Sequence, residues 1–582
     1  MNVSTAVDLA NDVLQDLDLP PAALRAFASL GASGGHLQNA ERDLHRWLKN
    51  LFGFTLQPYT IELNLQVDSK KTKPTNVSVL LPHEVVHALA SSNVPFVWDS
   101  IMLGNIDAAG RSSFWEHVRG LRPWSEHPIF DERGISFDKL LGFTIHGDGA
   151  VFKREDEVFV WSMSSIFAYE GMIQDVLLMK IPLCIIPERY MVSKSVRESV
   201  NSELAGLISW SFEHASRGRA PDRGYQGEVF CKTSYRSELS GQTLARGWRA
   251  CYFAMKGDLK ARKQMNRFTR HYGCNLLCER CLAQGGKHTP DNMAYRNFGS
   301  TAAWRLTEIS HETYMQMDRE SMSPWACVSG WRLDTVAWDF LHMVYLGTGR
   351  DLFASGLRAL IQQGAYEHLG IDDLDDLLDV IHLEMHRDCA EAGFYLPCKP
   401  VLNVASLGGL DDYAELASRY KASHVKLMLW WLTRKCQVVS DTKLEDPVLA
   451  ALSTCLWALQ RVIEIMSESG IVLEPSSARE ASQSLHVHLQ SYAWLALHYH
   501  DQKIMFFKVR PKTHYLYHMA NEIEALRLNF ALFWTFDEES FLGKVKSIAV
   551  QTHGKTMTHR VFQRYLLFVG MCLHTYRRKM SA

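Results

Sequence analysis

The stretch FTIHGDG at residues 143–149 decides the fold expected for this chain. Its first residues have the apolar character of a buried strand, and Asp148 follows where that strand ends. A second stretch, YFAMKGD at residues 252–258, repeats the pattern and places Asp258 at the end of another apolar strand. Neighbouring strands would bring the two carboxylates together. Because Gly-Asp after a strand is also a common turn signal, a simple turn stays open as the alternative at each position.

The segments around these two strands predict an α/β unit between residues 136 and 298. Residues 193–215 carry apolar side chains at the spacing of one helix face. Short apolar strands are expected at residues 140–145, 157–161, 176–186 and 248–255. Three strands, a helix and a further strand, in this order, form an α/β unit.

Three further regions flank or follow this unit. Residues 1–135 have a mixed α/β pattern, with a strand pair expected around residues 59–65 and the polar run 68–74, and they match no recognised DNA-binding module; DNA or a partner protein is their expected ligand. Residues 299–508 have an almost wholly helical pattern, and residues 509–582 continue it. Helices are expected at 334–361, 371–392, 422–438, 447–469 and 476–499.

Composition restricts the class of protein. With 582 residues, 47% hydrophobic and 22% charged, the chain has the composition of a globular protein with two to four domains. Neither a signal peptide nor a run of about 18 apolar residues is found, so a soluble, intracellular protein without a membrane segment is expected. The twelve cysteines are too sparse for a disulfide scaffold. The net charge of −2 gives no global sign of nucleic-acid binding, which would need local basic patches.

Four residues have the pattern of a zinc site. A C-x-x-C pair lets two thiolates share one tetrahedral ion, and two histidines four apart on a helix project from one face. The four residues are Cys278, Cys281, His514 and His518. The alternative is a reduced thiol pair with two unrelated histidines, and Cys274 or His288 could replace one ligand.

A third acid is expected at the start of a helix at residues 539–550, within the stretch DEESFLGKVK at 537–546. Favourable interaction with the helix dipole is enough to explain Asp537 and Glu538. Glu539 lies 21 residues after His518, so zinc binding by the histidines would bring it toward the α/β unit. Glu538 adjoins it, and the choice between the two stays open. Carboxylates gathered in this way are the oxygen ligands that Mg²⁺ prefers, and two such ions about 3.5–4 Å apart can cleave a phosphodiester.

The stretch HEVVH at residues 83–87 matches the H-E-x-x-H motif of zinc metallopeptidases. Such a motif is expected by chance in roughly one chain in seventeen of this composition. The following residues, ALASS at 88–92, exclude the extended motif with a third histidine, and Glu116 is the next glutamate. Pro82 fits the first position of a short helix, which explains the local pattern without a metal. A zinc metallopeptidase is therefore the least favoured function for this chain.

Taken in order, these elements resemble the DDE-type DNA transposases with an RNase H-like core, in particular the CACTA and Chapaev-like groups and the related V(D)J recombinase core. The resemblance covers residues 136–582 and depends on the order and spacing of the two strand-end aspartates, the C-x-x-C pair, the helical insertion, the histidine pair and Glu539. Within the insertion, DFLH at residues 339–342 is similar to the D-x-x-H motif of that group.

The resemblance implies an α/β fold in which an RNase H-like mixed sheet is interrupted by a large all-α insertion. It implies Asp148, Asp258 and Glu539 as catalytic ligands of Mg²⁺ or Mn²⁺, the Cys₂His₂ group as a structural zinc site, and a positioning role for Asp339 and His342. The implied reaction is hydrolysis of a DNA phosphodiester followed by strand transfer from the freed 3′-hydroxyl, in the nucleus and by a homodimer. The second alternative is a domesticated, catalytically inactive descendant acting as a DNA-binding or chromatin protein.

Basic residues beside the acids are expected to contact DNA phosphates. The candidates are Lys256, Lys260, Arg262, Lys263, Arg267, Arg270, Lys544 and Lys546. A solvated helix face is the alternative explanation for this group.

Overall fold

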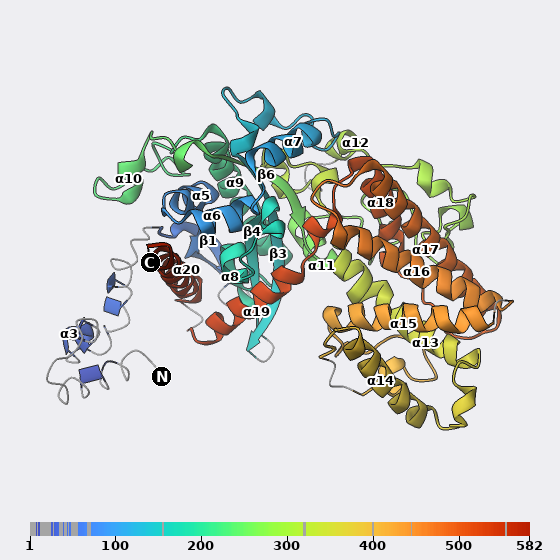
Figure 1. Cartoon of the computed structure of the whole chain (residues 1–582). Helices are drawn as coiled ribbons and strands as arrows, with labels where there is room; N and C mark the ends of the chain where they lie inside the picture. The colour runs from blue at the N-terminus through green and yellow to red at the C-terminus, as the bar shows by residue number, and fades with distance from the viewer. Residues whose placement is uncertain are drawn as a thin grey trace.

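The computed structural model describes residues 56–66, 71–153, 156–317, 322–397, 401–443, 445–552 and 556–581, with scattered positions before residue 56. One mixed sheet of six strands, in the order β1-β2-β5-β4-β3-β6, forms its centre (Figure 1). The strands are β1 (Tyr59–Gln66), β2 (Thr72–Val79), β3 (Leu140–Lys153), β4 (Asp156–Ser165), β5 (Ile181–Pro187) and β6 (Arg249–Lys256). The mixed α/β class expected from the sequence is confirmed.

The pairing of β3 with β6 determines where the two candidate aspartates lie. These strands run parallel, and His146 is paired with Lys256 in their register. On its other side β3 pairs antiparallel with β4, which in turn pairs antiparallel with β5. Beyond His146, β3 continues to Lys153 with β4 as its partner, whereas β6 ends at Lys256.

The strand pair expected near residues 59–65 is confirmed as the β1–β2 hairpin. Tyr59 is paired with Val79, and side chains along β1 alternate between buried and exposed. Val79 also pairs with Cys184 of β5, so the hairpin extends the same sheet. The boundary expected at residue 135 therefore divides strands that belong to one sheet.

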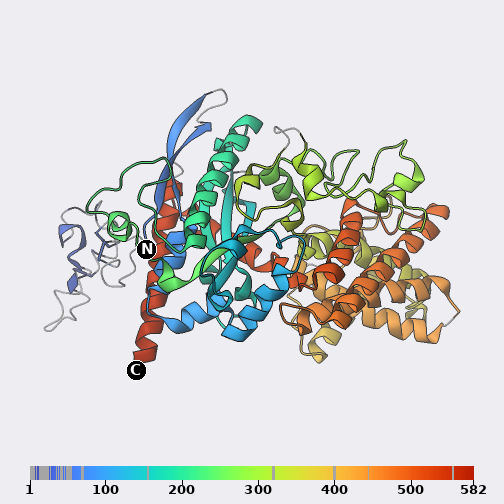
Figure 2. The same cartoon turned by 90° about the horizontal axis from the view of Figure 1, so that it is seen from above.

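Helices cover both faces of the sheet (Figure 2). Helix α9 (Lys194–Arg217) packs against β1 and β6 on one face, and α19 (Phe536–Val550) packs against β3 on the other. Helix α20 (Met557–Ser581), near the end of the chain, packs beside α19 and against β2 and β5. The remaining helices near the sheet include α5 (Pro82–Ala90), α6 (Pro95–Leu103), α7 (Ala108–Arg119), α8 (Val176–Met179) and α11 (Leu259–Asn266).

A separate group of helices stands to one side of the sheet, as the right-hand part of Figure 1 shows. It comprises α13 (Gly349–Gln362), α14 (Leu374–Glu391), α15 (Ala422–Thr442), α16 (Pro447–Glu468), α17 (Pro475–Asp501) and α18 (Pro511–Leu526). Helix α16 is the one described helix that is long and apolar enough to span a membrane, and 61% of its most apolar window is buried inside the protein, as in a core helix.

Three secondary-structure predictions were wrong in part. The strand expected at residues 140–145 continues to Lys153, so Asp148 lies within β3. Residues 176–179 form helix α8 instead of the start of a strand, because the Asp175 side chain caps the turn by accepting from the Leu177 N–H at 3.0 Å. The helix expected from residue 334 begins only with a π-helical segment, Leu341–Thr348. Before it, Val336 pairs in parallel with Met255 at the edge of β6, which holds this segment extended.

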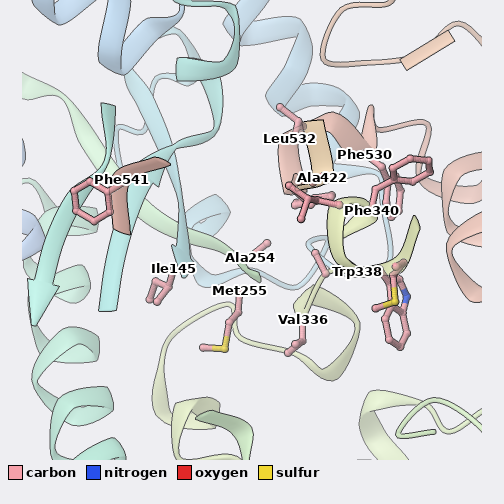
Figure 3. Packing of buried hydrophobic residues seen from close by; sticks show 14 of the residues in the cluster. Ile145, Ala254, Met255, Val336, Trp338, Phe340, Ala422, Phe530, Leu532 and Phe541 are labelled. Atoms are coloured by element: carbon pink, nitrogen blue, oxygen red, sulfur yellow. The ribbon is translucent and has the colours of Figure 1, made fainter. Parts of the chain in front are cut away.

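The sheet and the helical group share one hydrophobic core. Figure 3 shows Ile145 of β3, Met255 of β6, Val336 and Phe541 of α19 among the buried side chains at this junction. Each fully buried side chain of this size contributes about 1.5–3 kcal/mol by leaving water. The ends of β3 and β6 are thus held firmly against the helices that carry the other candidate residues.

Candidate functional site

The two aspartates lie on neighbouring strands, but only Asp258 follows the end of its strand; Asp148 lies inside β3 and pairs with Val160 of β4, so its prediction as a strand-end residue was wrong. Asp148 is in β3 two residues beyond His146, and Asp258 caps α11 by accepting from the Ala261 N–H at 2.6 Å. The backbones just before them are in contact, because a Cβ added to Gly257 would lie 3.2 Å from the carbonyl oxygen of Gly147. Gly257 has a φ of +153°, which also favours glycine.

Glu539 completes a group of three acids. Burial and the negative charges of Asp258 and Glu539 raise the pKa of Asp148 to about 8. Burial also raises the pKa of Glu539, and the charges of Asp339 and Asp258 act in the same direction, while His342 opposes them. The oxygens of the three acids do not all come within 4.8 Å of one another. A cation placed between the three acids would offset the repulsion among their charges.

Glu538 and Glu539 have different surroundings. Glu538 is 1% exposed and lies 2.6 Å from the Lys256 ammonium and 2.9 Å from that of Lys180. Burial alone would raise the pKa of Glu538, but the two lysines lower it well below its usual range. Glu539 is 44% exposed and lies on the side of the two aspartates. Of the two glutamates left open by the sequence, only Glu539 is available to a ligand.

The D-x-x-H motif connects the helical group to the acids. His342 Nδ1 contacts the buried carboxylate of Asp339, and its Nε2 lies 3.4 Å from Glu539 Oε1. The Thr535 hydroxyl donates to Asp339 at 2.6 Å. Burial alone would lower the pKa of His342, but the charge and hydrogen bond of Asp339, with Asp258 and Glu539, raise it to about 9. His342 is therefore held as a cation against the acid group.

The four predicted zinc ligands lie together, and their ligand atoms are all within 4.8 Å of one another. Cys278 Sγ is 3.4 Å from His518 Nε2, and Cys281 Sγ is 3.3 Å from His514 Nε2. The two Nε2 atoms are 3.2 Å apart. Tetrahedral zinc with ordinary bond lengths would separate sulfur from nitrogen by about 3.6 Å and the nitrogens by about 3.3 Å. This geometry fits a zinc ion.

The electrostatics of this cluster also fit a cation. Burial and the neighbouring Cys281 raise the pKa of the Cys278 thiol, so the thiolate needs a positive charge. The Arg280 backbone N–H donates to Cys278 Sγ at 3.3 Å. Burial lowers the pKa of His518 well below its usual range, which keeps the imidazole neutral as a ligand must be. Cys274 and His288, the alternative ligands, lie outside the group.

Two tryptophans fix the histidine rings. Trp304 packs edge-on against His514, with their ring centroids 4.4 Å apart. Trp338 lies nearly parallel to His518, with ring centroids 6.0 Å apart. The cluster joins α18 to the segment after α11, although the paired ligands are 233 and 240 residues apart in sequence. Zinc bound here would link the segment that follows Asp258 to the helix that precedes Glu539.

The predicted phosphate contacts require corrections. Lys256 is 3% exposed and pairs with Glu538, so it does not reach solvent. Arg262 is 2% exposed, pairs with Glu279 and stacks over the Trp338 ring at 3.9 Å. Both predictions were wrong, because the buried partners of these cations are distant in sequence.

The other predicted cations differ in accessibility. Arg267 is half-buried, and its Nη2 donates to the Glu198 carbonyl at 2.8 Å and to the Ser202 hydroxyl at 2.7 Å. Arg270 and Lys263 are half-buried. Lys544 and Lys546 are exposed on α19. Lys260 is exposed on α11, and its ammonium lies 3.8 Å from the Glu157 carboxylate.

The H-E-x-x-H motif does not gather metal ligands. Glu84 makes a bidentate ion pair with Arg236, at 2.6 and 2.8 Å. His83 Nδ1 bonds the Ser211 hydroxyl at 2.8 Å, and His87 Nδ1 accepts from the Ala245 N–H at 3.0 Å. Each side chain of the motif thus has a structural partner, and among the described residues only the Cys₂His₂ group brings three or more potential ligand atoms within 4.8 Å of one another.

Three contributors to the site were missed by sequence reasoning. Lys180 neutralises Glu538, Thr535 orients Asp339, and Lys512 lies close enough to Asp258 for the two charges to interact. The position of Lys512 could have been predicted from the sequence. It precedes His514 by two residues in the same helix, so its side chain points about 200° away from that of His514, on the side opposite the predicted zinc ligand.

Comparison with protein-family models gives no match to this chain, and comparison with curated proteins gives none either.

Proposed function

We propose that this chain is a DDE-type transposase or a transposase-derived nuclease, which cleaves DNA phosphodiesters and transfers strands with Mg²⁺ or Mn²⁺ held by Asp148, Asp258 and Glu539. The observation that carries the proposal is the convergence of these three acids from β3, the end of β6 and α19, with the pKa of Asp148 raised by burial and by the other two charges. Convergent carboxylates with perturbed pKa values are characteristic of functional sites.

The fold supports the RNase H-like part of the proposal. One acid lies in β3, the second follows the parallel neighbouring strand β6, and the third comes from a helix that packs on β3 after the helical group α13–α18. This is the order of elements that the resemblance implies. The zinc cluster supports it further, since it ties the chain before the helical group to the chain after it.

Each residue has a role in the proposed reaction. A bound divalent cation would supply an activated water and would stabilise the leaving 3′-oxygen. Asp148, Asp258 and Glu539 would bind the cation, whose charge would favour the ionised forms of Asp148 and Glu539, the two acids with a raised pKa. His342, held by Asp339, orients Glu539 through the 3.4 Å contact of its Nε2.

DNA is the proposed substrate, and exposed cations beside the acids would hold its backbone. Lys260 and Lys263 on α11, with Lys544 and Lys546 on α19, are the residues accessible for this role. Phosphate contacts of this kind fix the position of a duplex without reading its sequence.

The inactive-descendant alternative is less well supported. Asp148 and Asp258 form no ion pair with a lysine or arginine in the described ranges, so neither acid has been recruited for structure in the way that Glu538 has. All three acids are present at the site, with Asp148 and Asp258 half-buried and Glu539 exposed.

Nicking of supercoiled plasmid by the purified full-length chain tests the proposal. Wild type is expected to nick with Mg²⁺ or Mn²⁺, and Asp258→Asn is expected to lose the activity at least 100-fold. Asp156→Asn is the matched control and should retain the nicking activity. Asp156 lies on the neighbouring strand β4 and pairs with Arg189. Absence of cleavage by wild type with both metals would reject the nuclease and favour the DNA-binding descendant.

A further inference from the structure

Lys512 lies in the first turn of α18, two residues before the predicted zinc ligand His514, and its side chain packs against the π-helical segment that contacts the acid site through His342. Its ammonium donates to the Leu346 carbonyl at 2.9 Å, within the π-helix that carries His342. The side chain passes close over Gly347, where an added Cβ would lie 2.5 Å from Lys512 Cδ. Glycine at this position therefore keeps the path of the lysine open.

The charge of Lys512 is surrounded by acids but is not neutralised by an ion pair. Burial lowers its pKa, and the negative charges of Asp258, Asp339 and Asp351 oppose that effect. Asp351 is occupied by Arg510, at 2.6 and 2.9 Å, and Asp339 is occupied by His342 and Thr535.

Lys512 therefore has hydrogen-bonding capacity in reserve. An ammonium has three donors, and the Leu346 carbonyl is the one partner found for Lys512 among the described residues. The two buried lysines on the other side of the acids, Lys180 and Lys256, are both committed to Glu538. Lys512 thus differs from them in having a charge available to an anion at the acid site.

We propose that Lys512 binds a non-bridging oxygen of the scissile phosphate. This inference rests on the proposed function and names the residue that holds the reacting group. A phosphodiester brought beside three carboxylates needs positive charge on its other oxygens, and that need grows as negative charge develops in the transition state. Lys512 supplies this positive charge from helix α18. The predicted zinc ligands His514 and His518 follow it in the same helix, and Arg510, which pairs with Asp351, precedes it.

The alternative role is structural, in which Lys512 only holds the Leu346 carbonyl and so stabilises the π-helix. A matched control exists in the chain. Lys443, exposed at the end of α15, also donates its ammonium to a main-chain carbonyl, that of Gln363. Lys443→Met removes this type of bond without touching the acid site.

The experiment compares Lys512→Met, Lys512→Arg and Lys443→Met in the full-length protein. Single-turnover nicking of supercoiled plasmid at saturating Mg²⁺ is expected to fall 10²–10³-fold in Lys512→Met. Lys512→Arg should recover part of the rate, and Lys443→Met should match wild type. Zinc content and melting temperature are expected to stay at the wild-type level in all three.

A binding measurement separates this inference from the proposed function. The slope of log K against log salt for binding to random duplex DNA, without divalent metal, should become about 0.9 less steep in Lys512→Met, as for one lost phosphate contact. An unchanged slope, or a loss of activity that Lys512→Arg does not recover and that accompanies lost zinc, would overturn the inference. If wild type binds DNA but does not nick, the proposed nuclease fails while the slope still decides the role of Lys512.

Discussion

Glu538 and Glu539 are consecutive residues of α19, yet Glu538 is bound to Lys256 and Lys180 inside the protein whereas Glu539 contacts His342 at the acid site. Side chains of consecutive helical residues point about 100° apart, so one can be structural while the next is exposed to a ligand. Mutation of each should therefore affect a different property.

Glu538→Gln is expected to destabilise the fold by roughly 3–5 kcal/mol, because it leaves two buried lysines without their carboxylate. Glu539→Gln is expected to abolish metal-dependent nicking with little change in stability. Chemical denaturation and plasmid nicking of both variants check this pair. Equal loss of stability in the two variants would show that the assignment of the third acid is wrong.

Removal of one zinc ligand should release the metal. Cys281→Ser is expected to reduce bound zinc from about one ion per chain to near zero and to lower the melting temperature, since structural zinc contributes directly to folding. Cys274→Ser, a nearby cysteine outside the cluster, and His87→Ala, in the H-E-x-x-H motif, should both keep the zinc. Elemental analysis of the purified variants measures the result; zinc loss in His87→Ala alone would support a metallopeptidase.

Asp148 links the stability of the magnesium-free protein to pH. Burial and the charges of Asp258 and Glu539 raise its pKa from 3.8 to about 8. The stability from this group is therefore fully present below about pH 4 and is lost as pH rises through about 8. Asp148→Asn should melt above wild type without added magnesium, by a margin that is larger near pH 8 than near pH 5. A margin that does not vary with pH would contradict this prediction, as would a failure of Mg²⁺ to stabilise wild type near pH 8.

Asp339 should act through His342. Asp339→Asn weakens the contact that holds the imidazole as a cation, and a loss of about 10–100-fold in activity is expected, as for other residues that orient ligands. Thr535→Val, which removes the 2.6 Å hydrogen bond to Asp339, should give a smaller loss. Zinc content serves as the control for both. Wild-type kinetics in Asp339→Asn would show that the motif has no role in positioning.

Sequence reasoning succeeded where a local pattern determines a position. The C-x-x-C pair and the histidines four apart lie together as their spacing predicted, and Asp258 follows the end of its strand as expected, whereas Asp148 lies inside β3. In each confirmed case, periodicity within one strand or helix was enough to orient the side chains.

Sequence reasoning failed where a partner distant in the chain decides the outcome. Nothing near Lys256 or Arg262 in the sequence indicates that Glu538 and Trp338 will cover them. For the same reason, the pairing of Val336 with Met255 could not be read from a segment with helical periodicity. Tertiary packing overrides local preference at such positions.

The separation of the zinc ligands in sequence has a consequence for synthesis of the protein. Cys281 and His514 are 233 residues apart, which a ribosome covers in roughly 10 to 50 seconds. During that interval the nascent chain carries two aspartates and two thiols but lacks the histidines and Glu539. The proposed nuclease would therefore be inactive until Glu539 has been added, and a translation product that stops before Glu539 is expected not to cut DNA.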